Sequence, residues 1–300
     1  MPEKIKILFL GTSDSIPTAT RNHPSFLISY KGENILVDCG EGTQRQLRKA
    51  NLNPCKITKI LISHWHADHV LGIPGLLKTL AMSNYNKKLF IYCPKKTKKA
   101  LEILLKLFGF RNEISLEIKE VEGKFFENED FFIEANQLFH TVPCNAYSFV
   151  KKKKIKIDKE KLKKYKIPEG PHLKKLKEGK DLLYDGKKYK LEKLTYIEDE
   201  KKVSFIMDTS FNKKIINYVK NSDVLICEST FSSDFRNKAK EYKHLTSIEA
   251  AEIAKKSKSK KLFLVHISQR FSKNPEKILR ESKRIFKNTF LPKDFDLIEI

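Results

Sequence analysis

A run of six residues, His64-Trp65-His66-Ala67-Asp68-His69, restricts the possible fold of this chain more than any other feature. Imidazole and carboxylate groups are zinc ligands, and a zinc ion binds four or five such groups at roughly 2.0–2.2 Å. On extended backbone His64 and His66 point to the same side and can reach one ion. After a bend, Asp68 and His69 can face a second ion. The run therefore predicts a metal site and favours a zinc-dependent hydrolase.

Six residues cannot complete two coordination shells, so further ligands must come from later in the chain. Three candidates end apolar runs: His140, Asp208 and His266. A polar residue at the end of an apolar strand stands where layered α/β folds place ligands and catalysts. Any one of the three, taken alone, is compatible with an ordinary structural role. Together they would complete the set that the six-residue run begins.

Predicted strands and helices surround these residues. A β-branched strand at 57–62 leads directly into the run, and a helical pattern at 71–82 follows it. Strands and helices alternate in both halves, which favours a layered α/β architecture in one domain, residues 1–300. The other predicted strands are 6–10, 25–30, 33–37, 89–92, 203–207, 224–227 and 262–265, and the other predicted helices are 44–49, 96–110 and 246–254.

The segment 151–195 differs in composition from the rest of the chain. It contains eighteen lysines against seven acidic residues, a difference of +11 in 45 residues. Turn-forming residues lie near its centre, at Gly170-Pro171 and Gly179, so the centre is expected to be poorly suited to a core. We interpret the segment as a flexible basic arm that is extruded from the domain. A disordered linker is the alternative interpretation.

The overall charge and the cysteines limit the partners and the compartment. The chain has 60 Lys and Arg against 37 Asp and Glu, a formal net charge of +23. This excess favours a polyanionic partner, although a solvated lysine-rich surface would give the same composition. Five cysteines without a CxxC pair fit a reducing cytosol better than a disulfide framework. No apolar stretch approaches the ~20 residues that span a bilayer. We expect a cytoplasmic protein with no membrane partner.

The order of the candidate ligands resembles a known superfamily. HxHxDH followed by a distant His, Asp and His resembles the metallo-β-lactamase superfamily, whose fold is a four-layer αβ/βα sandwich of two mixed sheets. A more specific resemblance, along essentially the whole chain, is to tRNase Z, the endoribonuclease family that removes the 3′ trailer from precursor tRNA. It rests on Gly11-Thr12-Ser13, Arg21-Asn22-His23-Pro24-Ser25, Asp38-Cys39-Gly40-Glu41-Gly42-Thr43-Gln44, Asp208-Thr209, Cys227-Glu228-Ser229-Thr230-Phe231, His244-Leu245-Thr246 and His266-Ile267-Ser268-Gln269-Arg270.

The resemblance implies two Zn²⁺ ions per subunit. One ion would be held by His64, His66 and His140, the other by Asp68, His69 and His266, with Asp208 bridging the pair. Mn²⁺ or Fe²⁺ would also suit these ligands. Two ions about 3.5–4 Å apart suit phosphodiester hydrolysis, because the attacking and leaving oxygens are both stabilised. The expected products are a 3′-hydroxyl on the tRNA and a 5′-phosphate on the trailer.

Three residues are candidates for the chemistry of cleavage. Asp68 is the best-placed general base or orienter of the attacking hydroxide, and the resemblance implies the same role. His244 is not needed as a ligand and is the natural acid for the leaving 3′ oxygen. Glu228 could orient His244. The position before this glutamate, which is a histidine in the family, is Cys227 here, so the sequence departs from the family pattern at that side chain.

Other residues are candidates for substrate binding. Arg270 could bind a phosphate, although a surface ion pair would explain it equally well. Arg21 and Asn22 match the family's cleavage-position loop, in which Ala19 replaces the usual lysine. Gly170 and Pro171 match the tip of the family's tRNA-binding exosite. The family is typically a homodimer in which the arm of one subunit holds tRNA for the active site of the other.

Several neighbouring residues receive no direct role. Asp38 is expected to fix a turn beside the metal loop, where Gly40 and Gly42 let the backbone come close. His23 and His172 are placed outside the site.

Two other functions are compatible with parts of the sequence. A hydrolase of small phosphodiesters would use the same metal site but would gain nothing from the basic arm. A non-catalytic RNA-binding protein would use the arm but would have no need of the complete ligand set.

Overall fold

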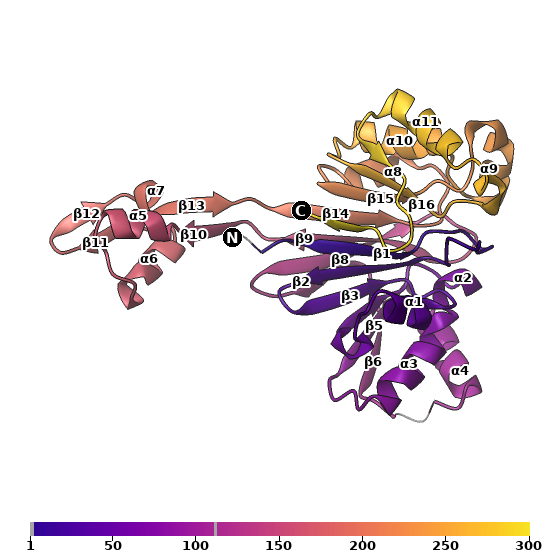
Figure 1. Ribbon diagram of the computed structural model, residues 1–300, viewed down its shortest axis with the longest axis horizontal. Helices are drawn as coiled ribbons and strands as arrows, with labels where there is room; N and C mark the ends of the chain where they lie inside the picture. Colours follow the sequence, from indigo (N-terminus) through magenta and orange to yellow (C-terminus); the bar gives the residue numbers. More distant parts are fainter. Residues whose placement is uncertain (1–2, 111–112) are drawn as a thin grey trace.

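The computed structural model describes residues 3–110 and 113–300, which form two seven-stranded sheets packed face to face between helices (Figure 1). The first sheet has the order β18-β1-β2-β3-β4-β5-β6. β1 to β3 are antiparallel and β3 to β6 are parallel, so the sheet is mixed. Its strands are β1 (Lys6–Gly11), β2 (Ser25–Tyr30), β3 (Glu33–Val37), β4 (Lys59–Leu61), β5 (Leu89–Cys93), β6 (Leu116–Glu120) and β18 (Leu297–Glu299).

The second sheet has the order β17-β16-β15-β14-β9-β8-β7 and is also mixed. β14 to β17 are parallel, whereas β7, β8 and β9 form an antiparallel meander. Its strands are β7 (Gly123–Glu127), β8 (Phe131–Leu138), β9 (Cys144–Lys151), β14 (Lys201–Ile206), β15 (Val224–Glu228), β16 (Leu262–Val265) and β17 (Thr289–Phe290). The sequence analysis identified three of the four parallel strands of this sheet, β14, β15 and β16, but neither β17 nor any strand of the meander.

Helices cover the outer face of each sheet and complete four layers. Leu47, Leu76 and Leu101 bury the helices of the first sheet in one apolar cluster, and Ile215, Ile253 and Ile278 do the same for the second. The layers agree with the predicted αβ/βα sandwich. The first set is α1 (Thr43–Lys49), α3 (Gly72–Met82) and α4 (Lys98–Leu107), the second is α8 (Lys213–Tyr218), α10 (Ser247–Lys256) and α11 (Glu276–Ile285), and the short helices α2 (Ala67–Val70) and α9 (Arg236–Tyr242) lie near the rim.

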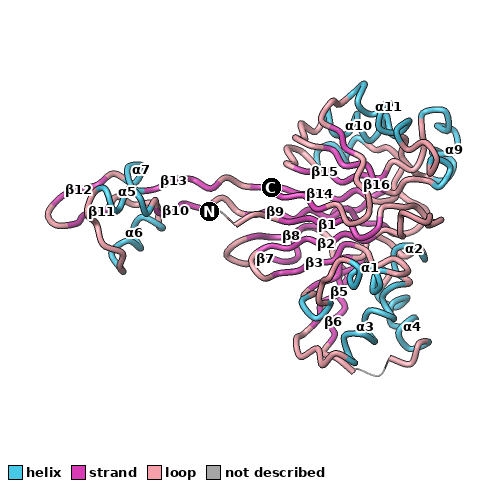
Figure 2. The backbone as a smooth tube through the Cα atoms, viewed as in Figure 1, coloured by secondary structure: helices cyan, strands magenta, loops and turns pink. Residues whose placement is uncertain are grey.

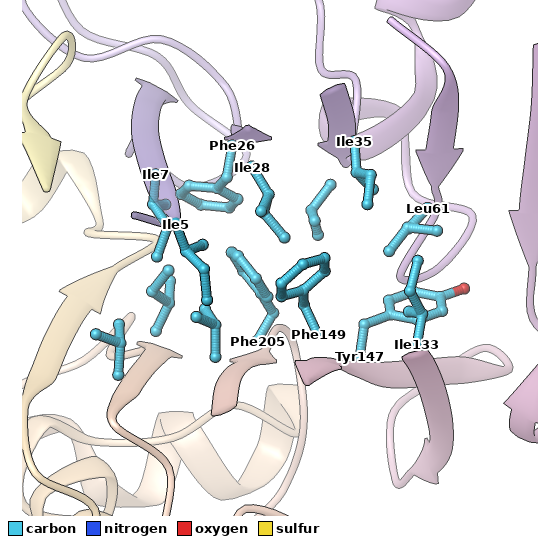
Figure 3. Close-up of a cluster of buried hydrophobic side chains, with 14 of the residues drawn as sticks. Ile5, Ile7, Phe26, Ile28, Ile35, Leu61, Ile133, Tyr147, Phe149 and Phe205 are labelled. Carbon is cyan, nitrogen blue, oxygen red and sulfur yellow. The ribbon is translucent and has the colours of Figure 1, made fainter. Parts of the chain in front are cut away.

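The main core lies between the two sheets and is rich in aromatic residues (Figure 3). The rings of Phe26 and Phe205, one from each sheet, lie 5.8 Å apart between centroids. Both faces of these strands are largely buried, so apolar residues occupy successive positions, as in Phe26-Leu27-Ile28 of β2. Buried Tyr147 donates a hydrogen bond of 2.8 Å to the carbonyl of Ile62, just before the metal loop. The core therefore fixes the backbone from which His64 projects.

The basic segment forms a small unit that projects from one end of the sandwich on a two-stranded ribbon (Figures 1 and 2). The ribbon pairs β10 with β13 and continues β9 and β14 of the body. The bounds of the unit's elements are β10 (Lys154–Ile157), α5 (Lys159–Lys164), a 3₁₀ turn (Pro171–Leu173), α6 (Lys174–Lys177), β11 (Leu182–Tyr184), β12 (Lys187–Tyr189), α7 (Leu191–Leu194) and β13 (Thr195–Glu198).

The prediction that the centre of this segment is unsuited to a core is wrong. Six of its apolar residues, including Leu162 and Leu176, are buried together in a separate cluster. The hairpin of β11 and β12 turns at Asp185-Gly186, both at positive φ, which is the typical two-residue hairpin connection. The apolar residues are sparse among the lysines, but the turns bring them together.

Candidate metal centre

The predicted ligands meet at the end of the sandwich opposite the basic unit. His64 and His66 follow β4, His140 follows β8, and Asp208 and His266 follow β14 and β16. These strands end at the same edge of the sandwich, where Asn145 N–H donates a 2.8 Å hydrogen bond across the sheets to the carbonyl of Ser63. Strand direction thus brings together side chains that are up to about 200 residues apart, such as Asp68 and His266 with a separation of 198.

The ligand atoms fall into groups small enough to hold a cation. The donor atoms of each group lie within 4.8 Å of one another. One group is His64, His66, His140 and Asp208, a second is Asp68, His69 and His266, and a third contains Asp208, Glu228, His244 and His266. Each of the seven predicted ligands belongs to at least one of these groups.

Asp208 lies between the first two groups. Its Oδ2 is 3.4 Å from His64 Nε2 and 3.7 Å from His69 Nε2, whereas its Oδ1 is 3.2 Å from His266 Nε2. On the other side, Asp68 Oδ2 is 3.3 Å from His69 Nε2 and 3.4 Å from His266 Nε2. Asp208 therefore lies within reach of both groups: Oδ2 is near His64 and His69, and Oδ1 is near His266, a position that suits a bridging carboxylate.

The chemistry of the donors fits a metal. Asp208 Oδ1 and His69 Nε2 are buried and have no hydrogen-bond partner among the described residues. Buried polar atoms are normally satisfied, so such orphaned donors and acceptors point to a ligand that completes them. Burial, helped by the nearby charge of His69, lowers the pKa of His64 to about 3. His64 is consequently a neutral imidazole, which is the form that binds a metal.

Four of the ligand histidines are held through Nδ1, which leaves Nε2 facing the centre. Ser63 Oγ lies 3.0 Å from His64 Nδ1, and Thr230 Oγ1 lies 2.8 Å from His266 Nδ1. The carbonyl of Lys243 is 3.0 Å from His140 Nδ1. Such partners fix ring orientation and tautomer at metal sites.

The fourth tether comes from Asp38. Its Oδ2 is 2.7 Å from His69 Nδ1 and accepts a 2.7 Å hydrogen bond from Ser63 Oγ, while its Oδ1 accepts one from Ser63 N–H. The sequence analysis gave Asp38 only the role of fixing a turn, whereas the structure shows that it also orients His69, a candidate ligand. A carboxylate directly after a strand and next to a glycine-rich turn was the available signal.

His244 and Glu228 form a pair at the rim of the centre. His244 Nδ1 is 3.2 Å from each carboxylate oxygen of Glu228. The Glu228 carboxylate also accepts hydrogen bonds from Thr209 N–H and Thr230 Oγ1. Burial by itself lowers the pKa of His244, but the carboxylates of Glu228 and Asp208 outweigh it and raise this pKa to about 9. The pair therefore keeps His244 protonated at neutral pH, with Nε2 free.

A cavity of about 450 Å³ opens over the centre. Asp68, His244 and Asp208 line it, and Arg270 lies at its border. The Arg270 guanidinium is 5.7 Å from the ring centroid of Phe231, and Nη1 donates to Ser268 Oγ at 3.3 Å. No ion pair of Arg270 occurs within residues 3–110 and 113–300, so the guanidinium is available to a phosphate.

Arg21 and Asn22 are engaged within the protein. Arg21 Nη1 donates to Thr12 Oγ1 at 2.6 Å and to the carbonyl of Pro292 at 2.7 Å. Asn22 Nδ2 donates to the carbonyl of Glu41 at 2.8 Å. Both residues hold the loop that borders the metal centre, and we do not propose them as substrate ligands.

Gly170 and Pro171 lie far from the centre, in the basic unit, where they line a separate cavity of about 450 Å³ together with Lys159, Lys174 and Lys177. His172, in the same unit, stacks on Tyr184 with 5.1 Å between centroids.

Gly40 and His23 lie directly behind the metal loop. A Cβ at Gly40 would be 2.3 Å from the carbonyl oxygen of Asp68 and 2.5 Å from His23 Cβ, so only glycine fits there. His23 is in none of the ligand groups found among the described residues, but burial lowers its pKa against the opposing charge of Asp68. It packs beside the centre rather than away from it.

Two mixed sheets between helices, with a His and Asp centre at one edge, define a protein of the metallo-β-lactamase fold. The structure aligns with the metallo-beta-lactamase fold protein YhfI of Bacillus subtilis at a TM-score of 0.73 and 20% identity, over 100% of both chains. It aligns with human tRNase Z, short form, at a TM-score of 0.71 and 26% identity, over 98% of both chains.

Sequence relatives narrow this class to one family. The chain is 40% identical to a ribonuclease Z of Nanoarchaeum equitans, over 88% of this chain and 84% of the relative. It is 32% identical to a ribonuclease Z of Archaeoglobus fulgidus, over 98% and 97%. A family model described as anti-Pycsar protein Apyc1 matches residues 5–158. The chain belongs to the ribonuclease Z family.

No helix in the described part of the chain is long and apolar enough to cross a membrane.

Proposed function

We propose that this protein is a metal-dependent endoribonuclease that removes the 3′ trailer from precursor tRNA in the cytoplasm. The observation that carries the proposal is the pair of ligand groups joined by Asp208, with the protonated His244 beside them, in a chain of the ribonuclease Z family. The products would be a 3′-hydroxyl on the tRNA and a 5′-phosphate on the trailer.

The ligand groups would hold two Zn²⁺ ions. One would bind to His64, His66 and His140, the other to Asp68, His69 and His266, and Asp208 would belong to both. When bound, such ions supply positive charge that stabilises the attacking and leaving oxygens of a phosphodiester. The buried unpartnered atoms Asp208 Oδ1 and His69 Nε2 support this assignment.

The side chains at the cavity would move the protons. Asp68 lines the cavity and would orient the attacking water and accept its proton. His244 would donate the proton on its Nε2 to the leaving 3′ oxygen, since Glu228 holds Nδ1. Arg270 would bind a non-bridging phosphate oxygen through its fork of N–H donors.

The basic unit would bind the body of the tRNA. Its lysines give a difference of +11 between residues 151 and 195, which suits a phosphate backbone and predicts affinity that falls steeply with salt. Gly170 and Pro171, with the lysines around their cavity, would form the contact surface.

We also propose that the protein acts as a homodimer. β14 begins next to the basic unit and ends next to Asp208, and β9 runs the opposite way between the same two places. The unit and the metal centre thus lie at opposite ends of the sandwich in one chain (Figure 1). A tRNA held by one subunit's unit would reach a metal centre most easily on a second subunit.

The test uses three proteins and two substrates. The first protein is wild type, the second is Asp68→Ala, and the third replaces residues 154–198 by a short turn between β9 and β14. We expect wild type to cut precursor tRNA, Asp68→Ala to bind it without cutting, and the truncated protein to lose tRNA binding while still hydrolysing bis(p-nitrophenyl) phosphate. Equal loss of both activities in the truncated protein would count against a dedicated binding unit.

A second candidate is hydrolysis of a small phosphodiester. The match of residues 5–158 to the Apyc1 model favours this candidate. The matched part contains five of the seven candidate ligands but little of the basic unit, so it resembles a protein family in a region that does not depend on a tRNA-binding unit. The basic unit argues against it, since a small substrate would not use such a surface. Efficient turnover of small diesters with precursor tRNA left intact would select this candidate. A non-catalytic RNA-binding protein would bind precursor tRNA and cut neither substrate.

A further inference from the structure

A second cavity, of about 720 Å³, adjoins His244 and has none of the candidate metal ligands in its lining. It shares His244 with the cavity over the metal centre, so the two compartments meet at this side chain. Its other lining residues come from the chain around Phe139, from Ser210-Phe211, from α9 with the following Lys243, and from α10. Apart from Lys243, whose carbonyl holds His140, none of these residues has been given a role in the proposed reaction.

The cavity is positively charged. Arg236 and Lys240 are one turn apart on α9, both exposed, and neither forms an ion pair with any of residues 3–110 and 113–300. Lys243 adds a third cation. Glu249 is the single acid of the lining within the described residues, and its carboxylate accepts hydrogen bonds from the N–H and Oγ1 of Thr246 at the start of α10. The three cations are therefore left to an anionic ligand.

An exposed aromatic ring stands at the edge of these cations. Phe139 is 58% exposed, so the face of its ring is accessible to a ligand. Its backbone is fixed on both sides: its N–H donates to Thr209 Oγ1 at 3.2 Å, and its carbonyl accepts from Ser210 N–H at 2.9 Å. Lys243 Nζ lies 4.9 Å from the ring centroid. An exposed ring on a fixed backbone next to cations suits a base stacked beside its phosphates.

The direction of the reaction decides which nucleotide this is. In an in-line displacement the attacking and leaving oxygens lie on opposite faces of the phosphorus. Cleavage that leaves a 3′-hydroxyl on the tRNA breaks the bond between phosphorus and O3′, and His244 gives its proton to that O3′. The nucleoside that carries O3′ must then lie on the His244 side, where the second cavity is.

We propose that this cavity binds the last nucleotide of the tRNA body, with its unpaired base stacked on Phe139 and the preceding phosphates on Arg236 and Lys240. The inference rests on the proposed function. Because the base is held by stacking rather than by hydrogen bonds to its edges, the site accepts any base. It therefore selects the position of the cut by where an unpaired base lies, not by its identity.

The decisive test combines a change in the protein with a change in the RNA. Wild type and Phe139→Ala are compared on normal precursor tRNA and on a precursor with an abasic ribose at the last tRNA nucleotide, by kcat/KM. Stacking of one base corresponds to roughly 5- to 150-fold. We expect wild type to lose a factor in this range on the abasic RNA. On normal RNA, the kcat/KM of Phe139→Ala should be lower than that of wild type by a similar factor. Removing the base should then lower the kcat/KM of Phe139→Ala very little further.

Controls separate stacking from damage to the fold. Phe108 is also exposed, at 62%, but lies at the end of α4 on the first sheet, so Phe108→Ala should cut both RNAs as wild type does. Phe139→Trp restores a stacking ring and should recover the rate that Phe139→Ala loses, with an unchanged melting temperature in both variants.

The phosphate contacts have their own test. Arg236→Ala with Lys240→Ala should reduce the slope of log kcat/KM against log salt by about 1.4, at about 0.7 per contact with a single strand. The matched pair Arg280→Ala with Arg284→Ala, with the same spacing on α11, should leave the slope unchanged.

Several results would overturn the proposal. One is a Phe139→Ala enzyme as fast as wild type. Another is a Phe139→Ala enzyme whose kcat/KM still falls on the abasic RNA by the same factor as that of wild type. A third is coupling of Phe139 to an abasic residue at the first trailer nucleotide, which would place the trailer in this cavity. Failure of the proposed function looks different, because wild type would then leave normal precursor tRNA uncut.

Discussion

The basic unit should be the part of the molecule most easily unfolded by a single substitution. Leu176, on α6, is fully buried in the unit's own apolar cluster. Replacing a fully buried leucine by alanine costs about 2–5 kcal/mol, because transfer energy is lost and a cavity remains. The cluster contains only six buried residues. A core in a unit of this size rarely supplies more than about 3–5 kcal/mol.

The cost of Leu176→Ala is therefore comparable to the whole stability that the unit's core can supply. The body has three larger clusters of its own and is joined to the unit by the ribbon of β10 and β13, so it should stay folded. We expect trypsin to cut the variant within residues 154–198 at concentrations that leave wild type intact, while the main melting transition keeps its temperature. Binding of precursor tRNA should be lost with the unit.

The matched control is Leu183→Ala on β11, since Leu183 is 66% exposed and belongs to the same unit. It should resist trypsin as wild type does. The reasoning is refuted if Leu176→Ala resists trypsin as wild type does. It is also refuted if the temperature of the main melting transition falls together with the resistance of the unit to trypsin. Either result would mean that the unit and the body unfold together.

Three further predictions concern the metal centre. Burial lowers the pKa of His244, but the charge of Glu228 outweighs it and helps to raise this pKa to about 9. Glu228→Gln removes that charge, so the loss of activity at alkaline pH should begin at a lower pH than in wild type. An unchanged pH–rate profile would contradict the role of His244 as the acid. Asp38→Ala frees His69 Nδ1 and should weaken metal binding about 10- to 100-fold in competition with a chelator, and unchanged affinity would show that the tether is dispensable. Gly40→Ala places a Cβ 2.3 Å from a carbonyl in the metal loop and should cost about 1–3 kcal/mol or more of folding stability, so a wild-type melting curve would show that the loop yields freely.

Much of the site follows from the sequence because metal ligands are chemically distinctive and strand ends are recognisable. His140, Asp208 and His266 each follow a strand, and the parallel run of β14 and β16 with β8 brings them to one edge. The resemblance to tRNase Z supplied the grouping of these ligands and the role of His244.

The remaining features depend on contacts between distant segments that no local pattern encodes. Asp38 and His69 are 31 positions apart, and nothing near either residue announces the hydrogen bond between them. The core of the basic unit was missed for a similar reason. Leu162, Leu176 and Leu194 come from helices of four to six residues, too short for an amphipathic period to be visible among the lysines.

The most direct test of the account is to map the ends of the RNA after reaction. Purified protein is incubated with zinc and a precursor tRNA that carries a 3′ trailer, and both product ends are sequenced and tested for phosphate. The account predicts one internal cut at the tRNA–trailer junction, with a 3′-hydroxyl on the tRNA, a 5′-phosphate on an intact trailer, and no cut by Asp68→Ala. Intact precursor, release of the trailer as single nucleotides, or a 3′-phosphate on the tRNA would contradict it.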